Sequence, residues 1–123
     1  MKYKVELYES VNGLKFGTDR DTVRKTLGDF SNITERDMFS NCFAEYRNEK
    51  LISIEIFGEF VVEVNGVIFS SNDEFEEMER KILLLDPDAN IDGCGATSKK
   101  CSIGTYFENG FESFLIGVEN YYS

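Results

Sequence analysis

A chain of 123 residues with a hydrophobic share of 41% can fill one core of ordinary size, so we expect a single domain spanning residues 1–123. Its 23 acidic and 13 basic residues give a formal net charge of -10, which disfavours binding to nucleic acids and anionic membranes and favours basic surfaces. Histidine is absent, which removes the commonest general base, the commonest metal ligand and the partner of every Ser-His or Cys-His nucleophile.

The first predicted elements are a strand over residues 2–8, where apolar and polar residues alternate, and a short helix. An Asn-Gly pair at residues 12–13 turns the chain between them. The helix should begin with Thr18 as its N-cap, whose hydroxyl would accept a hydrogen bond from an amide of the first turn. It should end at Gly28, which tolerates the left-handed conformation. The polar stretch 31–37 is then expected to be a loop.

Three strand-like runs come next and predict an antiparallel meander: residues 39–46, 51–57 and 60–64. A three-residue loop at 58–60 would set Ile54 opposite Val64 and give one continuous apolar face. The same register would set Glu55 directly opposite Glu63 on the other face, where facing like charges are destabilising.

That other face of the meander is the first candidate for a binding surface. It would carry two apolar residues beside three carboxylates: Glu55, Phe57, Glu59, Val61 and Glu63. Such a mixture resembles a docking patch for a basic partner. The alternative is a solvated sheet face over which Lys or Arg side chains of this chain fold.

A second helix follows an Asn-Gly turn at residues 65–66 and a short strand over 67–69. Ser71 and Glu74 would form a capping box, and Asp86-Pro87 should end the helix. Four apolar residues at helical spacing form one stripe: Phe75, Met78, Ile82 and Leu85.

The acidic start of this helix is a second candidate for partner binding, through Asp73 and Glu74. A solvated face is the favoured interpretation, because the first turn of any helix prefers negative charge. The helix can also neutralise its own carboxylates by pairing Glu76 with Arg80 and Glu77 with Lys81.

The predicted loop over residues 86–100 is a third candidate, because long polar loops are common recognition elements. Its acidic residues are Asp86, Asp88 and Asp92. Their spacing resembles a calcium loop, but Ile91 and Thr97 stand where that loop needs glycine and glutamate. We therefore expect these acids to face a basic partner and expect no metal.

The chain closes with a predicted hairpin between residues 101–107 and 111–118, joined across Asn109-Gly110. The expected cross-strand pairs are Ile103–Ile116, Thr105–Phe114 and Cys101–Val118. The order strand, helix, meander, helix, hairpin predicts the α+β class, with two layers in which an antiparallel sheet packs against two helices. The two helix-then-hairpin units suggest a structural pseudo-repeat without sequence identity.

No motif in the chain predicts catalysis or a cofactor. The three cysteines, Cys42, Cys94 and Cys101, form no disulfide framework and no CxxC pair, so free thiols are expected. There is no phosphate loop and no GxSxG elbow, which leaves a pair of catalytic carboxylates as the enzymatic alternative. The N-terminal segment lacks the apolar core of a secretory signal, which indicates the cytoplasm.

The segment 13–28, GLKFG followed by a capped helix that closes at Gly28, resembles an element of small bacterial α+β domains. Related helix openings occur in outer-membrane assembly lipoproteins, but the signal peptide and lipobox cysteine are lacking here. The later strand, acidic helix and aromatic hairpin ending in Tyr121-Tyr122 are similar in order to cytoplasmic immunity proteins of bacterial polymorphic toxin and contact-dependent growth inhibition systems.

That resemblance implies a protein that binds and neutralises one cognate toxin, often a basic nuclease, by covering or blocking its active site. It carries over no binding residues, because immunity proteins share no fixed ones. The alternative is an acidic interaction or regulatory module with a different protein partner.

Overall fold

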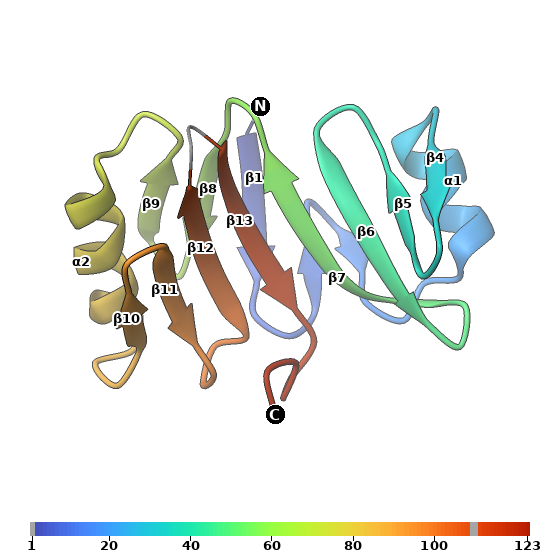
Figure 1. Ribbon diagram of the computed structural model, residues 1–123. Coiled ribbons are helices and arrows are strands. Elements are labelled where there is room, and N and C mark those ends of the chain that lie inside the picture. The colour runs from blue at the N-terminus through green and yellow to red at the C-terminus, as the bar shows by residue number, and fades with distance from the viewer. Residues whose placement is uncertain (1, 109–110) are drawn as a thin grey trace.

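The computed structural model describes residues 2–108 and 111–123, and within them the chain is a mixed α+β fold with two β-sheets and two helices (Figure 1). The helices are α1 (Arg20–Leu27) and α2 (Phe75–Leu85), and they lie at opposite ends of the sheets. The sheets pack face to face between them, so the predicted α+β class with two helices is confirmed, with two sheets where one was expected.

The smaller sheet has five described strands in the order β3-β2-β1-β8-β9. Their bounds are β1 (Lys2–Glu6), β2 (Ser10–Val11), β3 (Leu14–Lys15), β8 (Val61–Val64) and β9 (Val67–Ser70). Strands β1 and β8 run parallel, whereas the other neighbours in this sheet are antiparallel.

The larger sheet has eight described strands in the order β10-β11-β12-β13-β7-β6-β5-β4, all antiparallel to their neighbours. The first four in chain order are β4 (Ser31–Ile33), β5 (Arg36–Met38), β6 (Cys42–Arg47) and β7 (Lys50–Phe57). The other four are β10 (Asn90–Asp92), β11 (Gly95–Ser98), β12 (Ile103–Glu108) and β13 (Phe111–Gly117).

The fold consists of two units of the same order, each a hairpin, a helix and a four-stranded meander. The first unit runs β2-β3-α1-β4-β5-β6-β7 and the second β8-β9-α2-β10-β11-β12-β13, and they meet where β7 pairs with β13. Both hairpins turn at Asn-Gly pairs with positive φ, residues 12–13 and 65–66. The pseudo-repeat is therefore larger than the predicted helix-then-hairpin unit. The two units also share sequence identity, which was not expected, between VNGLKF at 11–16 and VNGVIF at 64–69.

The core lies between the facing sheets and is closed at each end by one helix. Both sheets contribute fully buried side chains, among them Val62, Val64, Phe69, Ala44, Ile56, Phe114 and Ile116. The ring of Phe114 lies 4.8 Å from that of Phe69 across the two layers. The helices add Val23, Met78 and Ile82, so the middle of the apolar stripe predicted for the second helix is buried, while Phe75 and Leu85 at its ends are half-buried.

Helix α1 begins one residue later than predicted. Asp19 is the N-cap and accepts the amide of Thr22 at 3.0 Å, whereas the Thr18 hydroxyl donates to the Lys15 carbonyl. Aspartate caps a helix at least as well as threonine, so two adjacent cap residues cannot be ranked from sequence. The predicted end at Gly28 is confirmed, with φ of 96° and its amide donating to Arg24.

Helix α2 lacks the predicted capping box. Glu74 occupies the N-cap position without a side-chain cap bond. The Ser71 hydroxyl instead accepts the amide of Phe60 at 3.0 Å, which ties the helix entry to the start of β8. The predicted end is confirmed, because the helix closes at Leu85, ahead of Pro87.

The predicted meander is wrong in its third strand. Strands β6 and β7 pair as expected, but β8 joins the other sheet, and the residues 58–60 connect the layers. Ile54 therefore faces Ala44 and Ile116, while Val64 faces strands of the smaller sheet. The physical reason is that both sides of β7 are already paired, by β6 and by the distant β13.

Each of the two predicted loops contains a short hairpin. The loop predicted at 31–37 holds β4 and most of β5, and the loop predicted at 86–100 holds β10 and β11. The outer strand of each is an exposed edge strand, and such strands have the polar composition of loops. The closing hairpin has the predicted pairs Ile103–Ile116 and Thr105–Phe114. Cys101 lies in a turn before β12, so its predicted pairing is wrong, and the Asn109-Gly110 turn lies outside the described residues.

Candidate functional site

The five residues predicted to form one acidic face are split between the two sheets. Glu55 and Phe57 alternate with buried residues of β7 and so lie on the outer face of the larger sheet. Val61 and Glu63 alternate with buried residues of β8 and lie on the outer face of the smaller sheet, on the opposite side of the molecule. Glu59 is exposed in the connection between the sheets. The predicted face is therefore not formed.

A patch of the predicted kind does exist on the outer face of the larger sheet, with other members. Because cross-strand partners share a face, the observed registers place there Met38, Phe43, Phe57 and Tyr106 together with Glu45, Glu55, Asp92 and Glu108. We call these eight residues the large-sheet face. The helices lie at the ends of the sheets and leave this face open (Figure 1).

The large-sheet face exposes apolar surface beside charge. Met38 is 38% exposed and Tyr106 is 41% exposed, and the rings of Phe43 and Phe57 lie 5.1 Å apart. Aromatic residues surrounded by polar groups are the usual composition of protein-binding hot spots. This face can therefore contribute both buried area and charge to an interface.

Glu55 in the middle of this face is already neutralised by the chain itself. Arg36 Nη2 lies 3.1 Å from Glu55 Oε1, and the Ser113 hydroxyl donates to Glu55 Oε2 at 2.7 Å. The Arg36 guanidinium also lies 4.0 Å above the ring of Phe43. Both oxygens of Glu55 are thus occupied. For this residue the structure agrees with the alternative interpretation of the sequence, in which Lys or Arg side chains of the same chain fold over the sheet face.

Glu45 is the neighbouring carboxylate and has no cationic partner among the described residues. The Ser53 hydroxyl donates to Glu45 Oε1 at 2.8 Å, and the Tyr121 hydroxyl donates to the same oxygen. Burial, and then this contact with Glu45, raises the pKa of Tyr121 to about 12. The phenol therefore remains a donor throughout the neutral range.

The C-terminal residues reach Glu45 because two glycines of the sheet leave room for aromatic rings. A Cβ on Gly117 would lie 2.6 Å from Cγ of Tyr121, and one on Gly104 would lie 2.5 Å from the hydroxyl of Tyr122. Side chains at these positions would displace the rings. The sheet surface is thus built to hold Tyr121 against Glu45.

A cavity of about 110 Å³ opens at this point of the large-sheet face. It is lined by Arg36, Phe43, Leu115 and Tyr121 beside the two glutamates, Glu45 and Glu55. We call it the Glu45 cavity. Its walls combine aromatic and aliphatic surface with one more negative than positive charge.

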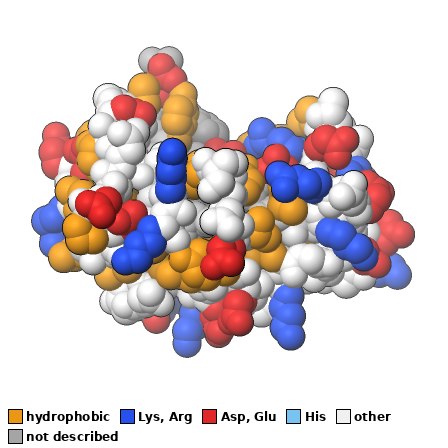
Figure 2. Space-filling model, turned by 90° about the horizontal axis from the view of Figure 1, so that it is seen from below, with side chains coloured by type: hydrophobic (Ala, Val, Ile, Leu, Met, Phe, Trp, Pro, Cys, Tyr) orange, Lys and Arg blue, Asp and Glu red, His pale blue; other side chains and the backbone are white. Residues whose placement is uncertain are grey.

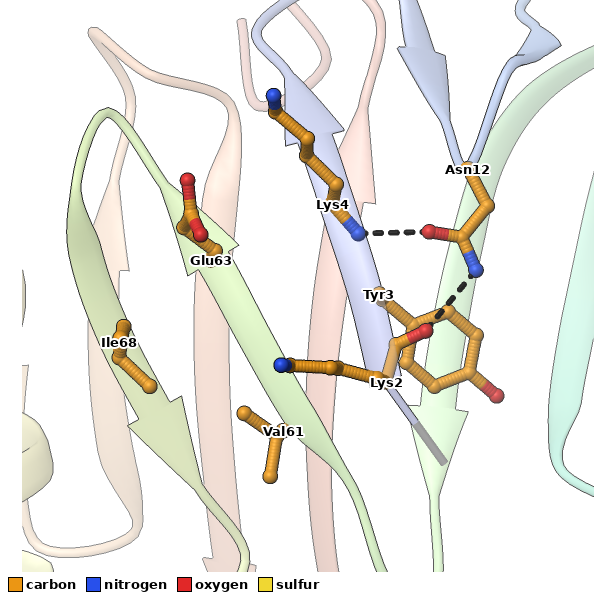
Figure 3. Close-up of a pocket in the computed structure, with 7 residues that line it drawn as sticks. All are labelled: Lys2, Tyr3, Lys4, Asn12, Val61, Glu63 and Ile68. Atoms are coloured by element: carbon orange, nitrogen blue, oxygen red, sulfur yellow. Dashed lines mark hydrogen bonds between the residues drawn. The ribbon is translucent and has the colours of Figure 1, made fainter.

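A larger groove of about 290 Å³ lies on the outer face of the smaller sheet, where Val61 and Glu63 are found (Figure 3). Lys2 and Lys4 extend from β1 beside them, and Ile68 from β9. The side chain of Asn12 accepts the Lys4 amide at 2.6 Å and donates to the Lys2 carbonyl at 3.0 Å. Two lysines against one glutamate make this groove unsuited to a basic partner.

Acidic residues at the start of α2 are partly neutralised within the chain. Asp73 lies 2.6 Å from Lys81 Nζ and also accepts the Ser70 amide. Glu77 pairs with Arg80 at 2.5 Å and lies 3.9 Å from Lys81, so the expected Glu77 to Lys81 pair is confirmed, while Arg80 pairs with Glu77 rather than with Glu76.

The three predicted acids after α2 differ in their surroundings. Asp86 is only 3% exposed, accepts the Ser98 hydroxyl at 2.7 Å and caps the amide of Asp88. It holds the loop to the sheet, so its prediction as a surface contact is wrong. Asp88 is exposed, as is Asp92, which accepts the amide of Cys94 and belongs to the large-sheet face.

The negative charge of the chain is concentrated in its second half. Residues 58–123 contain thirteen acidic and four basic residues, whereas residues 1–57 contain ten acidic and nine basic. Glu74 and Glu76 on α2 are exposed and have no cation beside them in the described part of the chain. At the end of the molecule shown in Figure 2, by contrast, Lys and Arg side chains are interspersed with Asp and Glu.

Sequence reasoning missed Glu45 and the role of Tyr121. The available signal was the two-residue connection between β6 and β7, where Asn48 and Glu49 both have positive φ. That turn sets Arg47 opposite Lys50, and a register shift between Glu45 and Tyr46 then places Glu45 opposite Ser53. The position of Tyr121 has no such local signal, because it depends on contacts with distant strands.

The chemistry of the cysteines is that of buried or half-buried free thiols. Cys42, Cys94 and Cys101 are all unbonded, as predicted. Burial raises the pKa of Cys42 to about 11, so this sulfur stays protonated at neutral pH and is a poor nucleophile.

No three metal-ligating side chains come together in residues 2–108 and 111–123. Over the same residues, no helix is both long and apolar enough to span a bilayer. Comparison with known proteins finds no matching sequence family, no matching characterised relative and no matching solved structure.

Proposed function

We propose that this chain is a binding protein that attaches to a basic protein through the large-sheet face and blocks it without catalysing a reaction. The observation that supports this is the open face itself, where exposed Met38 and Tyr106 lie among four carboxylates of the described strands. Aromatic anchors inside a complementary charged rim are typical of specific protein interfaces.

The charge of the second half supports the same proposal at longer range. Nearly all of the net charge of -10 belongs to residues 58–123, which carry α2 at one end of the sheets. Such a field speeds encounter with a basic partner and weakens as salt shortens the Debye length below about 8 Å. The acids of α2 can therefore act by steering without contacting the partner.

The partner that fits best is a cognate toxin, because the strand, acidic helix and aromatic hairpin predicted from the sequence resemble in order immunity proteins of bacterial toxin systems. A basic nuclease has the charge that this face accepts, and covering its cleft with carboxylates in place of phosphates would inhibit it. The proposal places the protein in the cytoplasm, where such a nuclease would act. A regulatory module with another basic protein partner remains the second candidate, supported by the same face.

The proposal predicts that the gene next to the one for this chain encodes a basic toxin domain. The test uses that domain and two matched substitutions. We expect a one-to-one complex that abolishes toxin activity and associates more slowly as salt rises. Met38→Arg on the large-sheet face should weaken affinity at least about tenfold, because it places a cation against a basic partner. Ile68→Arg, at an exposed apolar residue on the outer face of the smaller sheet, should leave affinity unchanged.

Binding measured by calorimetry and toxin turnover measured with its substrate give the two readouts. A complex weakened by Ile68→Arg and not by Met38→Arg would contradict the proposed face. No complex with the neighbouring toxin, or a complex that leaves toxin turnover unchanged, would contradict the function.

A further inference from the structure

Glu45, which lines the cavity, has one carboxylate oxygen that no other described residue binds. Ser53 and Tyr121 both donate to Oε1 of Glu45, and Oε2 has no hydrogen-bond or ionic partner in the described residues. Glu55 beside it has a partner on each oxygen. The cavity therefore offers one acceptor that carries negative charge and is already fixed in orientation.

The walls of the cavity suit a side chain with an aliphatic stem and a charged end. Phe43 and Leu115 provide apolar surface, and the Tyr121 ring closes another side. Ser53 is 2% exposed, so the floor under Glu45 is largely shielded from water. A cation held here would gain both a charge-assisted hydrogen bond and contact with aromatic faces.

The size of the cavity excludes most other occupants. Small-molecule sites usually occupy roughly 300–1,000 Å³, whereas this cavity measures about 110 Å³. That volume accommodates the end of one side chain. An anionic group is disfavoured, because two carboxylates and one guanidinium line the space.

We propose that the Glu45 cavity receives one basic side chain, lysine or arginine, from the partner protein. This inference rests on the proposed function and specifies its central contact. The side chain enters from the open face, its methylene groups lie against Phe43 and Leu115, and its cation binds Glu45 Oε2. Glu55 takes no part in the contact, because Arg36 already neutralises it.

The first test needs no partner protein. N-acetyl-lysine N-methylamide and N-acetyl-arginine N-methylamide are titrated into the full chain, with the neutral citrulline analogue as control, and amide shifts are followed by NMR. We expect saturable shifts around Glu45, Ser53 and Tyr121 with a dissociation constant in the millimolar range, and none with citrulline. The stronger of the two basic probes identifies the preferred side chain.

Matched variants assign the effect to one carboxylate. Glu45→Gln keeps the shape of the side chain and removes its charge, so it should weaken the binding of the basic probes at least about fivefold. Glu9→Gln makes the same charge change at an exposed residue that does not line the cavity and should have no effect. Three results would each overturn the inference: the citrulline analogue binds as well as the basic probes, Glu45→Gln binds the basic probes with unchanged affinity, or the amide shifts never saturate.

The two proposals fail in different ways. If the probes bind as expected but no toxin does, the cavity is a cation site and the proposed function is wrong. If the toxin complex forms and Glu45→Gln leaves its affinity unchanged, the function stands and the cavity is not its anchor.

Discussion

At the scale of single residues, Asp37 shows how this chain compensates a buried charge. Asp37 has a fully buried side chain and accepts from Arg24 Nε at 2.7 Å, from the Tyr46 hydroxyl at 3.0 Å and from Asn32 at 3.1 Å. Burial alone would raise the pKa of Asp37, but these three donors outweigh it and lower the pKa below its usual value.

Asp37 should therefore make stability depend on acid pH. Because its folded pKa lies below the unfolded value of about 3.9, its contribution is complete above that pH and is lost as pH falls toward the folded pKa. Asp37→Asn should cost about 3 kcal/mol at neutral pH and flatten this dependence. Urea unfolding between pH 2 and 7, as rough limits, measures both effects.

The matched control for this prediction is Asp29→Asn, at an exposed carboxylate. It should leave both the free energy of unfolding and its pH dependence nearly unchanged. If the free energy of unfolding of Asp37→Asn changes with pH in the same way as for the unchanged chain, another group causes the acid sensitivity.

At the scale of elements, local chemistry predicts what depends on neighbours in sequence. The structure confirms three features that follow from residues a few positions apart in sequence. These are the two helices, their ends at Gly28 and before Pro87, and the Asn-Gly hairpin at 65–66. The polar hairpins β4-β5 and β10-β11 were missed, because edge strands that face water lack an apolar period.

Pairing between distant strands is what sequence reasoning could not supply. The face of Glu55 and Glu63 was inferred from an adjacent hairpin, yet β8 pairs with β1 and β7 with β13. Nothing within residues 51–64 distinguishes those pairings from a meander. The sequence therefore predicted correctly that Glu55 and Phe57 share one face, and wrongly that Val61 and Glu63 join them there.

The C-terminal turn that forms one wall of the Glu45 cavity depends on a glycine of β13. Gly117→Ala would place a Cβ 2.6 to 2.9 Å from Cγ, Cβ and Cδ1 of Tyr121, so we expect a loss of about 1–3 kcal/mol and a displaced Tyr121. Gly93→Ala meets nothing within 4 Å and should be nearly neutral. Urea unfolding and the NMR signals of Tyr121 measure the two effects, and equal stability of both variants would contradict this account.

At the scale of the whole molecule, two units of the same order have diverged in charge. Each unit supplies half of the larger sheet, and the large-sheet face spans the junction of β7 and β13. The first unit contributes Met38, Phe43 and Glu45 to that face, and the second contributes Tyr106 and most of the net negative charge of the chain. Anchoring and steering are thus divided between the two units.

The most direct test of the central claim is a footprint of the bound partner on this chain. Cross-saturation NMR of the complex with the neighbouring toxin measures which amides lie against the partner's protons. We predict attenuation concentrated around Met38, Phe43, Phe57 and Tyr106 on the larger sheet. Attenuation concentrated around Ile68 of the smaller sheet, or around the exposed Leu84 of α2, would contradict the claim.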